Sequence, residues 1–328
     1  MKFILGLCSF SFLLILGAAL GVMGLLYTFQ TAGPLAEDTV FQVKRGQGVR
    51  QIARDLETQN IIINQYPFMA GAKLKNSGKP IQAGEYEIVA GASIASILNQ
   101  MQSGKVLHRR LTIPEGKTSY EIIQILNQKE GLQGAVKSIP PEGSLLPETY
   151  AYSIEDTRLD KISQMQEAMN NALNTAWNAR VADLPFTSSE EALILASIVE
   201  KETARADEYA KVAGVFINRL RKGMKLQTDP TVIYGITKGR HKNEGRGPLG
   251  RRLLTKDLRK DTPYNTYTRK GLPPTPICNP GKAAIEAVMN PATHDYIFFV
   301  ADGTGGHAFA KTLAQHNANV AKWRKIRK

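Results

Sequence analysis

In the N-terminal third of the chain, short stretches of alternating apolar and polar residues lead into a glycine and then into apolar residues at helical spacing. The pattern first appears over residues 41–56, returns 45 residues later over 86–101, and appears again over 111–126. Each copy predicts a short strand, a tight turn that uses the glycine, and an amphipathic helix. The turn glycines are Gly46, Gly91 and Gly116. The pattern indicates either a structural repeat or independent strand–helix units.

A buried helix is predicted in the middle of the chain. Ser188 followed by Glu191 is a capping-box pattern, which indicates that a helix begins there. Residues 192–199 are apolar on nearly every side, as expected of a helix inside a core. The far end of this helix carries Glu200, which shares one helical face with Ser197. This spacing predicts a carboxyl group at the end of an apolar stripe, with a small hydroxyl one turn away.

Further elements follow from the same kind of pattern. Residues 159–179 and 212–220 have helical periodicity, and the apolar, aromatic run over 296–301 predicts a buried strand. The Gln-Thr-Asp-Pro sequence over 227–230 predicts a turn, because the residue before a proline avoids helical backbone. The turn-rich segment over 142–150 is predicted to be a plain connector rather than a cleft loop. Together these elements predict an α+β fold, in which strand–helix units precede a mixed domain built around the central helix.

The first thirty residues predict a membrane anchor. No charged residue occurs from Phe3 to Tyr27, and this stretch is long enough to cross a bilayer as a helix. Lys2 precedes it, while Glu37 and Asp38 follow, so the positive-inside rule leaves the N-terminus in the cytoplasm and the rest of the chain outside. A cleaved signal peptide is the alternative, but its apolar core is usually shorter and ends at a small-residue cleavage site. The prediction is a single-pass protein of the cytoplasmic (inner) membrane, with the domains that follow the anchor on the periplasmic or extracytoplasmic side.

Composition adds the type of partner. The 328-residue chain has a formal net charge of +13 and a pI near 9.6, which favours a polyanion. Membrane lipid and cell-wall polymer fit this charge, whereas the predicted export of the chain argues against nucleic acid. Outside the predicted anchor, the cysteine is Cys278, expected as an exposed thiol, so no internal disulfide is expected. The histidines form no closely spaced pair, so neither a metal site nor another cofactor is predicted.

The position of Glu200 is suited to acid catalysis. Burial raises the pKa of a carboxylic acid by disfavouring its charged form, and a raised pKa is what a proton donor needs near neutral pH. The alternative is that Glu200 marks the point where a core helix reaches solvent and pairs with a basic residue. Glu202 is expected to point away from Glu200 and to pair with Arg205 as surface charge.

Polar clusters downstream combine the side chains with which proteins recognise sugars. Gln227 and Asp229 flank a threonine, and Tyr264 directly precedes Asn265. Tyrosine offers an aromatic face for a pyranose ring, and asparagine offers hydrogen bonds. A glycine-rich turn with His307 follows the predicted C-terminal strand, without a Walker pattern. Taken singly, each of these features is typical of a turn or a core.

Together and in this order, these stretches resemble the endolytic murein transglycosylase family (MltG, YceG-like) over roughly residues 110–320. The motifs that carry the resemblance are ILASIVEKE (194–202), VFINRL (215–220), LQTDPTV (226–232), YNTY (264–267), GLPP (271–274) and FVADGTGGH (299–307). The first strand–turn–helix unit resembles the opening of a LysM module, which binds N-acetylglucosamine polymers. The predicted domains are an anchor helix with a short linker over 1–30, a LysM-like domain over 38–108 and a transglycosylase catalytic domain over 109–328.

The family resemblance implies a specific activity. Such enzymes cleave the β-1,4 bond between N-acetylmuramic acid and N-acetylglucosamine in nascent peptidoglycan strands, form 1,6-anhydro ends and so limit glycan length. The resemblance assigns Glu200 as general acid and then base, and assigns Gln227, Asp229, Tyr264, Asn265 and His307 to the substrate cleft. The implied partners are peptidoglycan glycan strands, lipid of the cytoplasmic membrane and, by analogy, peptidoglycan synthases such as penicillin-binding proteins.

Two alternatives stay open at the level of sequence. An inverting glycan hydrolase would use Glu200 together with Asp229, because hydrolases of this kind need a second carboxylate to activate water. A membrane-tethered scaffold would bind peptidoglycan through the LysM-like module without catalysis, and Glu200 would then be a structural residue.

Overall fold

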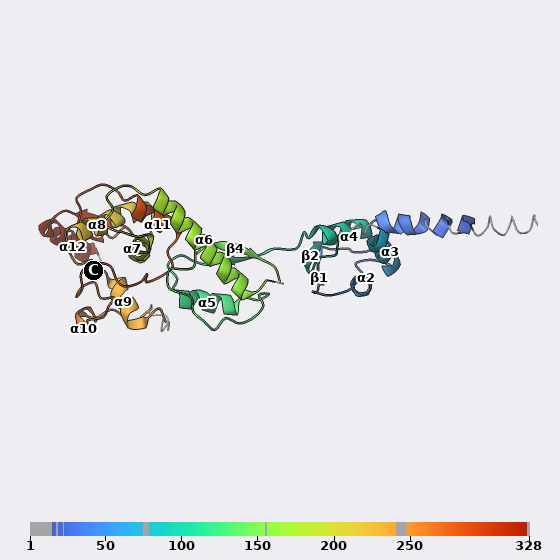
Figure 1. Cartoon of the computed structure of the whole chain (residues 1–328), viewed down its shortest axis with the longest axis horizontal. Coiled ribbons are helices and arrows are strands. Elements are labelled where there is room, and N and C mark those ends of the chain that lie inside the picture. Colours follow the sequence, from blue (N-terminus) through green and yellow to red (C-terminus); the bar gives the residue numbers. More distant parts are fainter. Residues whose placement is uncertain are drawn as a thin grey trace, which may run out of the picture. The chain divides into compact units, whose positions relative to one another are not determined.

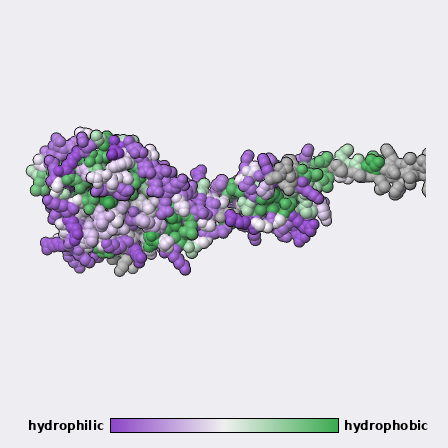
Figure 2. Space-filling view, in the orientation of Figure 1, coloured by the Kyte–Doolittle hydropathy of each residue, from purple (hydrophilic) through white to green (hydrophobic). Residues whose placement is uncertain are grey.

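The computed structural model of the chain describes residues 15–17, 19–21, 23–74, 79–154, 156–240 and 248–326. The chain divides into two compact units (Figure 1). The first unit contains the described residues up to Arg109 together with Gly131–Gln133 and Ala151–Asp156, and the second unit contains the remainder. Hydrophilic side chains cover much of the face of each unit seen in Figure 2, and each unit has its own buried apolar core.

The first unit is built on an antiparallel pair of strands. Its elements in chain order are β1 (Thr39–Val43), α2 (Val49–Thr58), α3 (Gln65–Leu74), β2 (Gly84–Ile88) and α4 (Ile94–Ser103). β1 pairs with β2, and Phe41 lies opposite Tyr86. The alternate residues Phe41 and Val43 are buried together with Ile52 and Leu56 of α2. The period-two pattern of the strand and the helical pattern of α2 therefore meet in one core.

The strand–turn–helix units predicted from the sequence are all present. The glycine between strand and helix has a left-handed backbone in each unit, with φ of 79° at Gly46, 69° at Gly91 and 71° at Gly116. Such angles are costly for a residue with a Cβ atom, which explains why glycine recurs at this place. The pairing of the strands does not repeat, because β1 pairs with β2 whereas β3 (Arg109–Thr112) pairs with β4 (Thr149–Tyr152).

The membrane anchor and the LysM-like module stay predictions. Most of the uncharged stretch from Phe3 to Tyr27 lies outside the described residues. Within the part of the chain that the structure describes, no helix is both long enough and apolar enough to cross a membrane. The first unit has the order strand, helix, helix, strand, helix, and this order does not by itself establish sugar binding.

The second unit contains the helices that surround the candidate site. Its elements after β3 are α5 (Ser119–Gln128), β4, α6 (Arg158–Asn178), α7 (Ser189–Glu202), the 3-10 helix η1 (Ala206–Glu208), α8 (Tyr209–Arg221), α9 (Asp229–Thr237), α10 (Thr255–Arg259), α11 (Lys282–Met289), β5 (Phe298–Ala301), β6 (His307–Ala310) and α12 (Leu313–Ile326). β5 and β6 are antiparallel, with Ala301 opposite His307. The mixture of helices and small sheets confirms the predicted α+β class.

Helix α7 is the buried centre of this unit, as the sequence predicts. It packs against α6, α8 and α11 (Figure 1), and Leu195 and Val199 are fully buried. Ser188 caps the helix, because its hydroxyl accepts a hydrogen bond from the Glu191 backbone N–H at 3.3 Å. The Glu191 carboxylate accepts from the backbone N–H of Thr187 instead of Ser188, so the reciprocal bond of the capping box is displaced by one residue.

Other predicted elements are present with shifted boundaries. Helices α6 and α8 match the predicted stretches 159–179 and 212–220, whereas the predicted strand over 296–301 begins only at Phe298 and is partly buried. Asp229 differs from its prediction as a turn residue, since it begins α9. The physical reason is that proline is tolerated in the first turn of a helix, where its missing N–H would have no partner within the helix.

Candidate active site

The carboxyl group of Glu200 lies at the C-terminal end of α7. Tyr209 Oη donates a hydrogen bond of 3.1 Å to Glu200 Oε1, and the Gly281 backbone N–H donates one of 3.0 Å to Glu200 Oε2. Burial raises the pKa of Glu200 and the negative charge of Glu115 adds to the rise, whereas the two hydrogen bonds oppose it. The side chain of Glu200 is only partly buried, so it keeps access to solvent.

A second carboxylate, Glu115, approaches the glycine that binds Glu200. A Cβ atom on Gly281 would lie 1.8 Å from Glu115 Oε1, so a side chain at this position would require the Glu115 carboxylate to move away from the start of α11. A Cβ atom on Gly116 would lie 3.5 Å from Glu200 Cγ. Gly281 therefore lets the Glu115 carboxylate approach the start of α11, whereas glycine is favoured at position 116 by the left-handed φ of 71°.

Ser197, predicted to lie one turn before the acid, is buried and serves the backbone. Its hydroxyl donates to Ile194 O at 2.7 Å and accepts from the Ile277 N–H at 3.0 Å. The neighbouring Cys278 thiol donates to Ser197 O at 3.3 Å and is fully buried, which corrects the expectation of an exposed thiol. Ser197 therefore holds the segment that leads to Gly281.

Glu202 is the main departure from the sequence prediction. The expected ion pair with Arg205 is absent from the described contacts, because Arg205 pairs with Asp207 and Glu202 accepts a hydrogen bond from the Thr228 hydroxyl. Burial raises the pKa of Glu202 to about 7, and the negative charge of Asp229 acts in the same direction. Helical periodicity predicts only that Glu202 leaves α7 from a different side than Glu200. It does not show that the segment before α9 covers that face.

Glu200 and Glu202 line the same pocket, which has a volume of about 360 Å³. The other lining residues are Glu115, Gly116, Lys201, Thr203, Ala204 and Tyr209. Two acids of raised pKa in one pocket form an arrangement that can transfer a proton to a bound substrate. Among the residues that the structure describes, no three His, Cys, Asp or Glu side chains come together as possible metal ligands.

Gln227 and Asp229 flank the threonine that contacts Glu202. Gln227 is exposed and has a left-handed φ of 51°, a costly conformation for a residue with a side chain. Asp229 is exposed at the start of α9 and accepts a hydrogen bond of 2.6 Å from Tyr267 Oη. Tyr267 is not among the residues predicted from the sequence, although it belongs to the same Tyr-Asn-Thr-Tyr motif. The segment that contacts Glu202 therefore carries a strained glutamine and, through Asp229, a negative charge that acts on the Glu202 carboxyl group.

His307 is held at this site by the carboxylate of Glu208, a residue that sequence reasoning missed. His307 Nδ1 lies 2.6 Å from Glu208 Oε2, and the His307 backbone N–H donates to Glu208 Oε1 at 3.0 Å. The imidazole also packs edge-on against the ring of Phe299. A positive charge on His307 would lower the pKa of Glu202 and so counteract the rise caused by burial, which means that the two groups interact electrostatically. The contacts with Glu208 fix the orientation of the imidazole toward this site.

Arg219 is a buried cation that the sequence prediction does not single out. Its Nε donates to Ile297 O at 2.6 Å, and its Nη1 donates to Leu226 O at 2.6 Å. Burial lowers the pKa of Arg219, whereas Tyr267 and Glu202 oppose this shift. The guanidinium group thus joins α8 to the segment before β5 and to the segment before α9. The only signal in the sequence is its place in the VFINRL motif.

Tyr264 and Asn265 are placed differently from the other predicted cleft residues. Asn265 is fully buried; its amide nitrogen donates to the backbone carbonyls of Leu258 in α10 and of Lys260 just after it, and its Oδ1 accepts from the Tyr267 N–H. These bonds shape the loop that carries Tyr267. Tyr264 lines a different pocket, described below. Of the predicted residues, the structure brings Asp229 and His307 close enough to Glu202 to act on its pKa, whereas Gln227 is exposed beside Thr228 and no contact of its side chain with Glu202 is described.

Two carboxyl groups of raised pKa, with hydroxyl, aspartate and imidazole groups near them, define a class of site that can perform acid–base chemistry on a bound substrate. The chain belongs to the YceG-like family, whose model matches residues 41–322. This match confirms the resemblance predicted from the motifs.

Named relatives and a solved structure agree with this family. An endolytic murein transglycosylase of Bacillus subtilis (strain 168) is 31% identical over 312 residues, which cover 86% of this chain and 83% of that protein. Another, from Streptococcus pneumoniae serotype 2 (strain D39 / NCTC 7466), is 29% identical over 366 residues, covering 96% of this chain and 64% of that longer protein. The crystal structure of a YceG-like protein from Listeria monocytogenes superposes with a TM-score of 0.51 at 30% identity, covering 86% of this chain and 99% of that one.

Proposed function

We propose that this chain is a peptidoglycan lytic transglycosylase that cleaves the β-1,4 bond between N-acetylmuramic acid and N-acetylglucosamine within glycan strands. Relatives in two bacterial species are endolytic murein transglycosylases, and the family match extends over most of the chain. The observation that carries the proposal is the carboxyl group of Glu202, which has a pKa of about 7 and lies between a pocket and the segment that contains Asp229. Such a group can give and take a proton near neutral pH.

Glu202 is our candidate for the catalytic acid, in preference to Glu200. The pKa of each carboxyl group is raised by burial, but Glu200 accepts hydrogen bonds from both Tyr209 and Gly281, which stabilise its ionised form. Glu202 accepts one described hydrogen bond, from Thr228, and the negative charge of Asp229 disfavours its ionised form. The assignment of Glu200 from the sequence is the competing hypothesis.

The proposed reaction uses one carboxyl group in two protonation states. Protonated Glu202 donates its proton to the glycosidic oxygen while the bond to C1 of the muramic acid breaks, and positive charge develops at C1. The N-acetylglucosamine side leaves as an alcohol. The Glu202 carboxylate then accepts the proton of the C6 hydroxyl of the same muramic acid, whose oxygen bonds to C1 and closes the 1,6-anhydro ring. Glu202 is again protonated, and no water is consumed.

The residues around Glu202 are assigned supporting roles. The Thr228 hydroxyl orients the carboxyl group through its hydrogen bond. The negative charge of Asp229, which Tyr267 holds in place, favours protonated Glu202 and the positive charge that develops at C1. His307, fixed by a carboxylate, is a candidate to hydrogen-bond the glycan.

The masses of the products test the type of reaction. Glycan strands digested by the full-length chain in ¹⁸O-labelled water are expected to give fragments with unlabelled 1,6-anhydro ends, one water lighter than hydrolytic fragments. An inverting hydrolase that uses Asp229 to activate water would instead introduce the label at the new reducing ends. A scaffold without catalysis would bind peptidoglycan and release no fragments. Mass spectrometry of the digest distinguishes these outcomes.

The pH dependence of cleavage tests the pKa of the acid. Glu202 must be protonated in order to donate, and its protonated form predominates below a pKa of about 7. The value of kcat/KM is therefore expected to be level in mildly acidic solution and to fall about tenfold per pH unit above about pH 7. The measurement is the rate of fragment release between about pH 5 and pH 9. Activity that increases as the pH rises through neutrality would contradict the proposed role.

We also propose that the chain acts at the outer face of the cytoplasmic membrane, held there by the uncharged stretch from Phe3 to Tyr27. The net charge of +13 suits a protein that faces anionic lipid and cell-wall polymer. Enzymes that polymerise the same glycan strands in that membrane are the proposed protein partners. Deletion of residues 1–30 tests the anchor, because it is expected to move the protein from the membrane fraction to the soluble fraction.

A further inference from the structure

We propose that a second pocket of the catalytic unit binds a sugar residue of the glycan strand away from the bond that is cleaved. This pocket, here called the Tyr264 pocket, has a volume of about 550 Å³ and is lined in part by Glu142, Asn170, Leu193, Tyr234, Tyr264 and Thr275. Its lining residues differ from those of the pocket that contains Glu202. The inference rests on the proposed glycan substrate and gives that substrate a second point of attachment.

The Tyr264 pocket combines aromatic faces with polar groups, the combination that binds a pyranose ring. The ring centroids of Tyr234 and Tyr264 lie 4.9 Å apart, with the rings tilted by 59°. Tyr264 Oη lies 2.9 Å from Thr275 Oγ1, and Lys238 Nζ lies 4.2 Å from the centroid of the Tyr264 ring. These contacts hold the Tyr264 ring in position. Leu193 of α7 contributes an apolar wall, which suits the methyl group of an acetamido sugar.

Glu142 forms the polar end of the Tyr264 pocket. Its carboxylate accepts hydrogen bonds from the Ser119 N–H at 2.7 Å, from Asn279 Nδ2 at 3.1 Å and from Tyr234 Oη at 3.2 Å. Burial raises the pKa of Glu142, although the hydrogen bonds from Ser119 and Tyr234 oppose the shift. The plain connector predicted over 142–150 therefore begins with a residue that lines a pocket, which corrects the prediction. The reason is that contacts from distant segments hold this carboxylate inward.

Shared elements connect the Tyr264 pocket to the catalytic pocket. Ile194 lines the Tyr264 pocket and Glu202 lines the catalytic pocket. These two residues of α7 are eight positions apart, or about 12 Å along the helix axis. The loop before α11 lines the Tyr264 pocket with Thr275 and donates a hydrogen bond to Glu200 through Gly281. A polymer that continues beyond its cleaved bond is the kind of ligand that can occupy both pockets.

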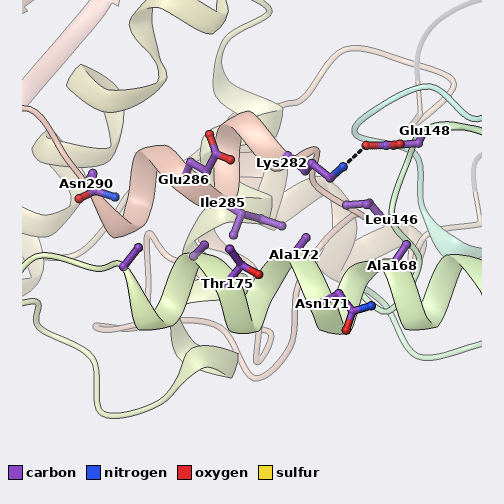
Figure 3. Close-up of a pocket in the computed structure, with 12 residues that line it drawn as sticks. Leu146, Glu148, Ala168, Asn171, Ala172, Thr175, Lys282, Ile285, Glu286 and Asn290 are labelled. Carbon is purple, nitrogen blue, oxygen red and sulfur yellow. Dashed lines mark ion pairs between the residues drawn. The ribbon is translucent and has the colours of Figure 1, made fainter.

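Another pocket, between α6 and α11, has a volume of about 690 Å³ but lacks the aromatic faces of the Tyr264 pocket (Figure 3). Its described lining includes no aromatic side chain, Ile285 of α11 is directed toward α6, and Lys282 and Glu148 form an ion pair at one end. This pocket supplies a control for the experiment. Asn171 lines it, whereas the preceding residue of the same helix, Asn170, lines the Tyr264 pocket.

Asn170→Trp and Asn171→Trp form a matched pair of tests. Both asparagines are exposed on α6, so an indole at either position is expected to be tolerated in the fold, but only the indole at position 170 enters the Tyr264 pocket. Affinity is measured with the full-length chain carrying both Glu200→Gln and Glu202→Gln, so that the strand is not cut whichever glutamate is the acid. The probe is a long peptide-free strand of alternating N-acetylglucosamine and N-acetylmuramic acid.

Asn170→Trp is expected to weaken binding of the long strand at least about tenfold, while Asn171→Trp leaves it unchanged. Equal affinities of the two variants would overturn the proposal. A free stem peptide is the second probe; if Asn170→Trp weakens its binding but not that of the peptide-free strand, the pocket holds peptide and the glycan assignment is wrong. Tyr264→Ala, with its thermal unfolding recorded, is expected to show the same loss as Asn170→Trp. The proposed catalytic activity is judged separately, by the fragments that the unmodified chain releases.

Discussion

Replacing Glu202 with glutamine is expected to slow glycan cleavage by about 100- to 10,000-fold, which is the usual contribution of a general acid. Glutamine has nearly the same shape and can still accept the hydrogen bond from Thr228, but it has no acidic proton to donate. The measurement is the rate at which the full-length chain releases anhydro fragments from purified peptidoglycan.

The stability of the same variant distinguishes lost chemistry from a lost fold. The pKa of Glu202 is about 7 in the folded protein and 4.5 for an ordinary glutamate, so the carboxyl group is protonated in both states at low pH and ionised in both at high pH. As the pH rises from about 4.5 to about 7, the unfolded chain ionises Glu202 more readily than the folded protein does, so the free energy of unfolding falls. Glu202→Gln is expected to raise the free energy of unfolding by up to about 3 kcal/mol near pH 8 and to leave it unchanged near pH 4. Thermal unfolding at the two pH values checks this.

Glu200→Gln is the matched control, because both glutamates lie near the end of α7 and line the same pocket. It is expected to reduce cleavage less than about tenfold, since glutamine can keep the hydrogen bond from Tyr209 and loses only an acceptor for the Gly281 N–H. An inactive Glu200→Gln variant beside an active Glu202→Gln variant would reject our assignment and support the one predicted from the sequence.

Asn279→Ala is expected to lower the free energy of unfolding by about 3 kcal/mol or more. Asn279 is fully buried; its Oδ1 accepts from the Leu145 N–H at 2.9 Å and its Nδ2 donates to Glu142 Oε1 at 3.1 Å. Alanine would leave the Leu145 N–H without this partner and would remove one donor from a buried carboxylate. Each such loss costs on the order of 1–3 kcal/mol. The measurement is urea unfolding followed by circular dichroism.

Asn290→Ala is the control for this prediction. Asn290 follows the last residue of the same helix, α11, and its side chain is exposed, so its removal is expected to change the free energy of unfolding by less than about 0.5 kcal/mol. If Asn279→Ala destabilised the protein no more than Asn290→Ala, the buried hydrogen bonds of Asn279 would not hold the loop before α11 as described. Cleavage by Asn279→Ala is also expected to fall, because that loop carries the Gly281 N–H to Glu200.

Local elements could be predicted because their causes lie within a few residues. The left-handed glycines Gly46, Gly91 and Gly116 follow from the change from strand to helix periodicity around them. The start of α7 at Ser188 follows from a cap that involves only neighbouring residues. Asp229 shows the limit of such reasoning, since a proline that ends one helix can equally begin another.

The candidate site could be predicted only in part. Its motifs identify Asp229 and His307, but the residues that hold them come from distant segments. Tyr267 lies 38 positions from Asp229, and Glu208 lies 99 positions from His307. The fold also changed expected roles, because the buried amide of Asn265 donates to backbone carbonyls at the end of α10 and Tyr264 lines a separate pocket. Patterns of residue type contain no information about which distant groups become neighbours.

The sequence by itself determined that a buried helix ends in a pair of acids, because apolar periodicity and capping act locally along the chain. Only the tertiary structure decided the environment of each acid. Glu200 lies against the start of α11, whereas Glu202 lies beneath the segment that precedes α9 and has a pKa of about 7. The pKa of a carboxyl group depends on the burial, charges and hydrogen bonds around it. At the last turn of this helix, those surroundings come from parts of the chain that are distant in sequence.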